Sequence, residues 1–234
     1  MQAVILCGGL GTRLRSAVSD RPKCLAEVAG EPFLLLLLDY YIQAGVTQFI
    51  LATGHLSEQI EALFAGLDYN YRGAKILISR EPEPMGTGGA LKFAESLLDE
   101  EFMMINGDTW MECEPESLCL QMKQTGAEIV LALRQVADVG RYGEVVLDTH
   151  SPRIISFAEK SAQGGPGFIN AGVYYIKRSA LRLIPVRQKC SLETDVFPLL
   201  LAEAAMVGVA FAGQFIDIGI PQDYQRAQLM LARS

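Results

Sequence analysis

Short apolar runs alternate with longer amphipathic stretches along the first half of the chain. The apolar runs have the length of buried strands, and the amphipathic stretches carry apolar residues at the spacing of one helix face. Strands separated by helices in this way pair in parallel through right-handed crossovers. The pattern therefore predicts an α/β fold with a doubly wound, mostly parallel, Rossmann-like sheet. The predicted strands are 3–7, 49–52, 75–79, 102–106 and 128–133, and the predicted helices are 33–44, 57–65 with Ser57 as its N-cap, 87–98 and 115–125.

The pattern changes at about residue 134, where short apolar segments are separated by turns rich in Ser, Pro and Gly. Such turns between short strands are typical of antiparallel pairing. We expect a smaller antiparallel elaboration built from strands 144–147, 154–157 and 173–176. Because the chain has no internal repeat, low-complexity tract or long linker, we expect one domain over 1–234, with a core over about 1–133 and the elaboration and closing part over about 134–234.

Charge and composition exclude several classes of protein. The chain carries 20 Lys and Arg residues against 27 Asp and Glu residues, a net charge of -7, whereas nucleic acid and anionic lipid usually attract a basic surface. No apolar run approaches the ~20 residues of a membrane helix, and the N-terminus lacks the pattern of a signal peptide. The five cysteines contain no CxxC pair, which indicates neither a disulfide framework nor a zinc cluster. We therefore expect a cytoplasmic protein with no nucleic-acid or membrane partner.

Histidine is scarce, because His55 and His150 are the only two in the chain. Zinc sites and hydrolase triads generally depend on histidine. The composition therefore nearly excludes both, and it favours a reaction that needs no histidine as general base.

A glycine-rich loop follows the first predicted strand, with Gly8, Gly9 and Gly11 leading to Arg13. Ligands of parallel sheets bind at the carboxyl ends of the strands, where glycines let backbone N–H groups approach an anion closely. The loop lacks both the Gly-Lys-Ser/Thr of a P-loop and the third glycine of a dinucleotide fingerprint. Arg13 and Lys23 add two cations close to it. The loop and the cations together suit the phosphates of a nucleoside triphosphate.

The segment from Leu6 to Leu14, followed by Arg21-Pro22-Lys23, resembles the signature of the sugar-1-phosphate nucleotidyltransferases. The resemblance covers essentially the whole chain, because later landmarks stand in the family's order. Within the family, the chain looks most like the D-glycero-α-D-manno-heptose 1-phosphate guanylyltransferases in its length and in the run from Phe215 to Tyr224. The other landmarks are Glu81 to Ala90, Asn106-Gly107-Asp108, Arg141-Tyr142-Gly143, Glu159-Lys160, Asn170-Ala171-Gly172 and Phe215 to Gly219.

The resemblance implies a role for each matching residue, with the core binding the nucleotide and the second part binding the sugar. The catalytic residues that it implies are Arg13, Lys23, Asp108 and Lys160. The implied nucleotide-binding residues are Leu6, Gly8, Gly9, Gly11, Thr12, Arg13, Glu81, Gly86, Thr87 and Gly107, and the implied sugar-phosphate-binding residues are Gly143, Glu159, Lys160, Asn170 and Gly172.

A magnesium site is expected from two aspartates. Asp108 follows a predicted strand and Asp217 follows a later apolar stretch, so both could reach the same edge of the sheet. Two carboxylates together with phosphate oxygens suit Mg²⁺, which prefers oxygen ligands. The resemblance implies this pairing, with Asp108 and Asp217 as metal ligands and Mg²⁺ as cofactor.

The base of the nucleotide is inferred from Glu81. In the family, the residue at its position faces the Watson–Crick edge of the base, and Gly86 to Gly89 would form the opposite wall. An ionised carboxylate only accepts hydrogen bonds, and guanine offers two adjacent donors, N1–H and the N2 amino group. Uracil and thymine offer one donor flanked by acceptors, which a glutamine would serve. Glu81 therefore favours GTP.

The expected reaction is the transfer of GMP from GTP to a sugar 1-phosphate, with D-glycero-α-D-manno-heptose 1-phosphate as the implied acceptor. The product would be a GDP-sugar for surface polysaccharide biosynthesis, and a homodimer is the working expectation for the assembly. The alternatives are a mannose 1-phosphate guanylyltransferase, a UTP-dependent amino-sugar-1-phosphate uridylyltransferase and, in a different class, a nucleotide-binding regulatory module without catalysis. The residues expected to distinguish the sugars are Arg141, Tyr142 and the loop 164–168.

Overall fold

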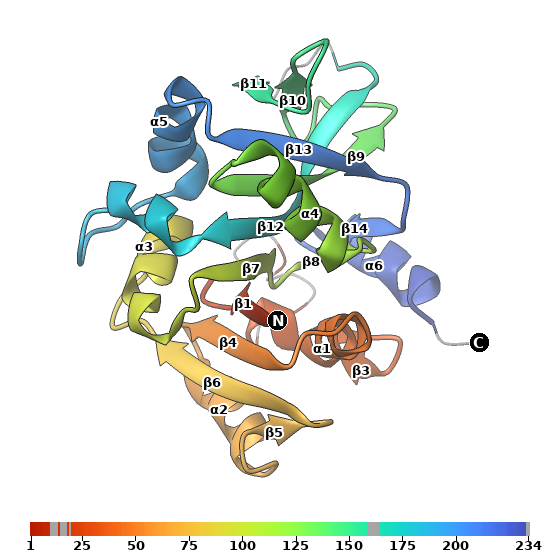
Figure 1. Cartoon of the computed structure of the whole chain (residues 1–234). Coiled ribbons are helices and arrows are strands. Elements are labelled where there is room, and N and C mark those ends of the chain that lie inside the picture. Colours follow the sequence, from red (N-terminus) through yellow and green to blue (C-terminus); the bar gives the residue numbers. More distant parts are fainter. Residues whose placement is uncertain (10–13, 15–17, 19, 159–163, 233–234) are drawn as a thin grey trace.

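A computed structural model describes residues 1–9, 14, 18, 20–158 and 164–232 (Figure 1). The described residues form an eight-stranded central sheet whose strands lie in the order β13-β9-β12-β7-β1-β4-β6-β5. The strands are β1 (Gln2–Leu6), β4 (Gln48–Thr53), β5 (Asn70–Tyr71), β6 (Ala74–Arg80), β7 (Glu101–Asn106), β9 (Ile129–Val136), β12 (Gly167–Lys177) and β13 (Met206–Phe211).

Most neighbours in this sheet are parallel. β1 pairs in parallel with β4 and β7, β4 with β6, and β13 with β9. Only β12 and the short β5 run antiparallel to their partners within the described sheet. The prediction of an α/β fold with a mostly parallel sheet is confirmed.

The position of β12 differs from the prediction. Strand 173–176 was expected in the antiparallel elaboration, but it belongs to β12, which lies between β7 and β9 in the centre of the sheet (Figure 1). Its direction is antiparallel, as expected. Val173, Tyr174 and Ile176 are each 0% exposed, because elements on both faces of the sheet cover them. The second half of the chain therefore completes the same sheet that the first half begins.

Helices cover both faces of the sheet, which makes it doubly wound. On one face, Ala3 and Ile5 of β1 share a buried cluster with residues of α1, α2 and α4. On the other face, Val4 shares a second cluster with residues of α3, α5 and a 3-10 helix. The helices are α1 (Phe33–Gln43), α2 (Ser57–Ala65), α3 (Gly86–Phe93), α4 (Pro115–Thr125), α5 (Phe197–Ala202) and the 3-10 helix Arg178–Leu183.

The start of α2 also differs from the prediction. Leu56, with a φ of 58°, precedes the helix as its N-cap, and Ser57 is the first helical residue. The Ser57 hydroxyl is buried with no hydrogen-bond partner among the described residues, so it does not cap the helix. The predicted helix 87–98 is shorter than expected, because α3 ends at Phe93 and a 3-10 turn, Glu95–Leu97, follows.

Three small antiparallel pairs surround the central sheet. β10 (Glu144–Leu147) pairs with β11 (Ile154–Ala158), which confirms the expected elaboration. β2 (Glu27–Val28) pairs with β3 (Glu31–Pro32), and β8 (Thr109–Met111) pairs with β14 (Phe215–Asp217) just before α6 (Pro221–Met230). The pairing of β8 with β14 joins the segment after β7 to the segment before α6.

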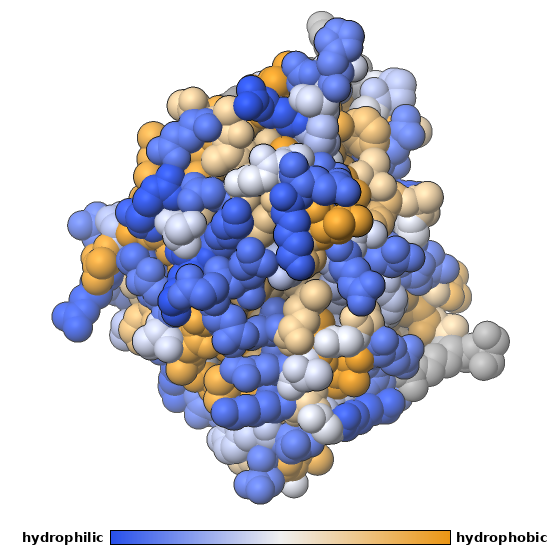
Figure 2. All heavy atoms as spheres, in the orientation of Figure 1, coloured by the Kyte–Doolittle hydropathy of each residue, from blue (hydrophilic) through white to orange (hydrophobic). Residues whose placement is uncertain are grey.

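Polar residues cover most of the face shown in Figure 2, and apolar residues appear there in small groups. None of the helices in the described part of the chain is long and apolar enough to cross a membrane.

Two glycines that end helices provide a matched test of backbone strain. Gly126 ends α4 with a φ of 73°, and a Cβ there would meet nothing within 4 Å, so Gly126→Ala adds left-handed strain without a clash. We expect a loss of about 1 kcal/mol in the free energy of unfolding. Gly66 ends α2 with a φ of -66°, so Gly66→Ala should be neutral or slightly stabilising. Urea denaturation measures the free energy of unfolding of both variants. Equal changes would contradict the attribution of the loss to the left-handed backbone at Gly126.

Candidate active site

Two adjoining cavities, each of about 210 Å³, lie where parallel strands of the sheet end. Leu6, Gly9 and Thr87 line both of them. Ligands of parallel sheets bind at the carboxyl ends of the strands, so the position suits a substrate site. The first cavity is further lined by Cys7, Lys23, Cys24, Asn106, Gly107 and Asp108, and the second by Gly8, Ala52, Glu81, Pro84, Gly86, Ala90 and Lys189.

The structure brings together the described residues for which the sequence predicted nucleotide binding. They come from the end of β1, from the start of α3, from the segment after β6 and from the end of β7. Gly11, Thr12 and Arg13 lie outside the described residues. The residues with this prediction that line one or both cavities are Leu6, Gly8, Gly9, Glu81, Gly86, Thr87 and Gly107.

Close backbone contacts explain two of these glycines. The Gly107 N–H donates to the Leu6 carbonyl at 3.1 Å, and a Cβ on Gly107 would lie only 2.5 Å from that oxygen. A Cβ on Gly8 would lie 2.8 Å from Oε1 of Glu81. Glycine therefore lets β7 end against β1 and lets the loop after β1 lie beside the Glu81 carboxylate.

The glycines at the start of α3 have a different role from the one expected. Gly86 lines the second cavity, but Gly88 and Gly89 donate their N–H groups to the Cys190 carbonyl, at 2.9 and 3.1 Å. A Cβ on Gly86 would lie 2.6 Å from the same carbonyl oxygen. The expected wall of Gly86 to Gly89 is thus only partly present, because Gly88 and Gly89 pack against a later segment around Cys190.

Glu81 is held in the second cavity by burial and by one hydrogen bond. Its side chain is mostly covered, at 8% residue exposure, and Oε2 accepts a 2.8 Å hydrogen bond from the Met85 N–H. Burial raises the pKa of Glu81 above its ordinary value, although the Met85 hydrogen bond opposes this shift. The cavity therefore presents a carboxyl group whose ionisation depends on its surroundings more than that of a surface acid.

Lys23 and Asp108 form an ion pair in the first cavity, with Nζ 2.5 Å from Oδ2. The pairing of β8 with β14 brings Asp217 opposite Thr109, next to Asp108. A Cβ on Gly219 would lie 2.6 Å from Oδ1 of Asp217 and 3.1 Å from Nζ of Lys23. Lys23 therefore lies close to both predicted metal ligands.

These two aspartates fit a partial magnesium site. Within the described ranges, no group of three or more His, Cys, Asp or Glu side chains is placed to hold a metal ion. Mg²⁺ usually binds one or two carboxylates and completes its coordination with water and substrate phosphates. Asp108 and Asp217 could supply the two carboxylates of such an arrangement.

Cys7 also lines the first cavity, beside Cys24. The contact with Cys24 and burial both raise the pKa of the Cys7 thiol well above its ordinary value. A thiol held protonated is a poor nucleophile. Covalent catalysis by Cys7 is therefore disfavoured.

Two of the residues predicted to bind the sugar phosphate lie on an irregular part of β12. Asn170 accepts from the Gly172 N–H at 3.0 Å and donates to the Tyr174 hydroxyl at 2.7 Å. Gly172 has a φ of 72°, and a Cβ there would lie 2.9 Å from Nδ2 of Asn106, at the end of β7. The irregularity therefore places Gly172 against Asn106, which lines the first cavity, although Asn170 and Gly172 are not among the residues that line it. Glu159 and Lys160 lie outside the described residues.

The loop that contains Gly143 contacts α6 and β14 through its neighbouring residues. Arg141 forms an ion pair with Asp223 of α6, which is 2% exposed, and the Tyr142 ring lies 5.9 Å from the Phe215 ring. Gly143 has a φ of 88°. The ion pair gives Arg141 a role in holding this loop, and the expectation that Arg141 distinguishes sugars stays a prediction.

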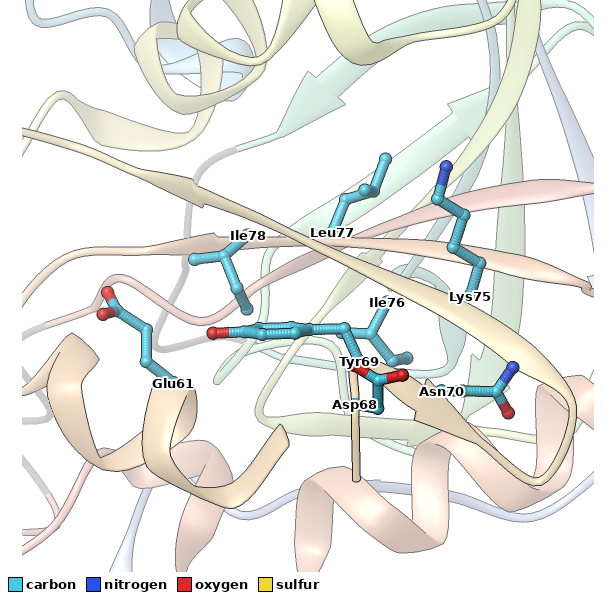
Figure 3. Close-up of a pocket in the computed structure, with 8 residues that line it drawn as sticks. All are labelled: Glu61, Asp68, Tyr69, Asn70, Lys75, Ile76, Leu77 and Ile78. Atoms are coloured by element: carbon cyan, nitrogen blue, oxygen red, sulfur yellow. The ribbon is translucent and has the colours of Figure 1, made fainter. Parts of the chain in front are cut away.

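A larger cavity of about 650 Å³ lies elsewhere, between α2, β5 and the first part of β6 (Figure 3). Figure 3 shows the Tyr69 ring extending toward Glu61, whereas Lys75 points away. The amino-terminal half of β6 lies at the end of the sheet opposite to the glycine loop. This cavity therefore does not belong to the site formed by the strand ends.

Known proteins resemble this chain over nearly its full length. It is 38% identical over 229 residues to the D-glycero-α-D-manno-heptose 1-phosphate guanylyltransferase of Aneurinibacillus thermoaerophilus, covering 97% of each chain. It is 34% identical to the mannose-1-phosphate guanylyltransferase catalytic subunit beta of Danio rerio, covering 100% of this chain and 65% of that relative. The crystal structure of HddC from Yersinia pseudotuberculosis complexed with GMP-PN matches with a TM-score of 0.85 and 32% identity, covering 98% of this chain and 99% of the other.

The similarity confirms the family resemblance inferred from the glycine loop and the later landmarks. A family model described as nucleotidyl transferase matches residues 2–234. The fold of the described residues and the full-length relatives agree with this match. The chain therefore belongs to the nucleotidyl transferase family.

Proposed function

We propose that this protein transfers GMP from GTP to a sugar 1-phosphate, releasing pyrophosphate. The observation that supports it most directly is the buried Glu81 carboxylate in a cavity beside the glycine loop. A carboxylate there can accept from both N1–H and the N2 amino group of guanine. The HddC complex with GMP-PN, a relative over nearly the whole chain, agrees with a guanine nucleotide.

The reaction needs positioning and charge stabilisation more than proton transfer. An oxygen of the sugar phosphate, already ionised near neutral pH, attacks the α-phosphorus of GTP as the bond to the bridging oxygen breaks and pyrophosphate leaves. The glycine loop and Arg13 would hold the leaving group, and Lys23 and Lys160 would steady the α-phosphate and the nucleophile. This division of roles explains why the chain can act with so little histidine.

We further propose that Asp108 and Asp217 hold Mg²⁺ when the nucleotide binds. The ion would supply positive charge to the phosphate oxygens. Lys23 already contacts Asp108, so the Lys23 ammonium must share that carboxylate or move toward the phosphates.

A heptose 1-phosphate is the acceptor that we favour, because the Aneurinibacillus relative named for this sugar is similar over 97% of both chains. Mannose 1-phosphate is the second candidate, supported by the 34% identity to the Danio rerio enzyme. A role in surface polysaccharide biosynthesis and the cytoplasmic location follow from this proposal and stay predictions. Rates of GDP-sugar formation with both sugar phosphates would decide between the two acceptors.

Asp108→Asn tests the proposed role of Asp108 as a Mg²⁺ ligand and partner of Lys23. We expect kcat to fall by roughly 10²- to 10³-fold, as when one group that stabilises a charged transition state is lost, with little change in the melting temperature. Pyrophosphate release from GTP and the sugar phosphate measures the rate. Asp20→Asn is the matched control, because Asp20 also pairs with a cation, Arg21, but its side chain is 70% exposed. Wild-type turnover in Asp108→Asn would reject the assignment.

Glu81→Gln tests the choice of base. Replacing the carboxylate removes one of two acceptors, so we expect kcat/KM for GTP relative to UTP to fall roughly 10- to 100-fold. Glu83→Gln is the control in the same loop, because Glu83 is exposed and lines neither cavity. An unchanged preference for GTP in Glu81→Gln would contradict the role of Glu81.

The raised pKa of Glu81 predicts a dependence on pH. As the pH falls through this pKa, the carboxyl gains a proton and loses an acceptor for guanine, so kcat/KM for GTP should decline at a higher pH than an ordinary carboxyl would cause. The decline should be absent in Glu81→Gln and present in Glu83→Gln. An identical pH profile in all three proteins would assign the titration to another group.

A further inference from the structure

The segment around Cys190 forms part of the wall of the second cavity, although it lies about a hundred residues after Glu81 in the chain. The Cys190 carbonyl accepts from Gly88 and Gly89 in the first turn of α3. Thr87 accepts a 2.9 Å hydrogen bond from the Leu192 N–H and donates one of 2.8 Å to Glu193. Hydrogen bonds at Cys190 and at the residues just after it therefore fix this segment to α3.

The same segment is also linked to Glu81. The Met85 N–H donates to Oε2 of Glu81 at 2.8 Å, and the Met85 carbonyl accepts from the Cys190 N–H at 2.9 Å. One residue, Met85, thus connects the carboxylate to the backbone of Cys190. The backbone next to Lys189 is therefore held in a defined position relative to Glu81.

Lys189 lines the second cavity together with Glu81, Pro84 and Ala52, and it does not line the first. The first cavity holds the Lys23–Asp108 pair and the end of β7, where the phosphates are expected. An ammonium group carries three donors and no acceptor. The residues that line the second cavity thus include one carboxylate, on Glu81, and one ammonium group, on the exposed Lys189.

We propose that Lys189 is a specificity-determining residue that donates a hydrogen bond to O6 of guanine while Glu81 accepts from N1–H and the N2 amino group. The inference rests on the proposed use of GTP. Guanine presents two donors and one acceptor in a row on this edge, so Glu81 alone leaves O6 without a protein partner. Among the residues that line this cavity, Lys189 is the cation that could donate to O6.

Lys189→Met tests this assignment through kcat/KM with three nucleotides. GTP and ITP both carry O6, whereas 2-aminopurine riboside triphosphate lacks it. We expect Lys189→Met to lower kcat/KM for GTP and ITP by the same factor, roughly 10-fold, and to leave the low value for the 2-aminopurine nucleotide near that of the wild type. Glu81→Gln should behave differently, because ITP lacks the N2 amino group and should lose less than GTP.

Arg187→Met is the matched control, since Arg187 is an exposed cation in the same segment that lines neither cavity. It should leave all three nucleotides unchanged. An equal loss for all three nucleotides in Lys189→Met would overturn the proposal, because it would place the ammonium group on the phosphates or ribose. Full GTP activity in Lys189→Met would overturn it as well. If instead the wild type shows no preference for GTP over UTP, the proposed function itself fails.

Discussion

The site depends on the close approach of two strand ends, where the Gly107 N–H meets the Leu6 carbonyl without room for a side chain between them. This contact brings the residue after Gly107, Asp108, to the same place as the glycine loop that follows Leu6. Asp108 then pairs with Lys23, and β8 aligns Asp217 beside it. The cluster of charges in the first cavity is thus a consequence of backbone packing between β1 and β7.

The two cavities separate two kinds of recognition. The first gathers charged groups around Lys23, which pairs with Asp108, lies near Asp217 and is largely covered, with 13% of its side chain exposed. The second is lined mainly by small and apolar residues around Glu81. Electrostatic attraction is strong but not selective, whereas a few hydrogen bonds in a less polar pocket can distinguish one base from another. In a protein with a net charge of -7, the proposed binding of a polyanion would depend on Lys23 and the proposed Mg²⁺ at this one place, and not on the overall charge.

Much of the fold and part of the site could be predicted from local sequence. The apolar run before Gly8 and the helix pattern after Pro32 sufficed for β1 and α1, because a buried strand and an amphipathic helix leave strong local patterns. The central place of β12 could not be predicted, since a run such as Val173 to Ile176 does not indicate which strands it will join. Lys189 belongs to none of the sequence motifs. Its place in the cavity depends on backbone hydrogen bonds between Cys190 and α3, which a pattern of side chains does not predict.

The docking of Cys190 on α3 has a consequence for anion binding. The start of a helix usually offers free N–H groups that attract phosphate. In α3, two of these donors, on Gly88 and Gly89, are already occupied by the Cys190 carbonyl. These two N–H groups are therefore unavailable to an anion. In the proposed function, the triphosphate would then meet the loop after β1, and the start of α3 would face the rest of the nucleotide.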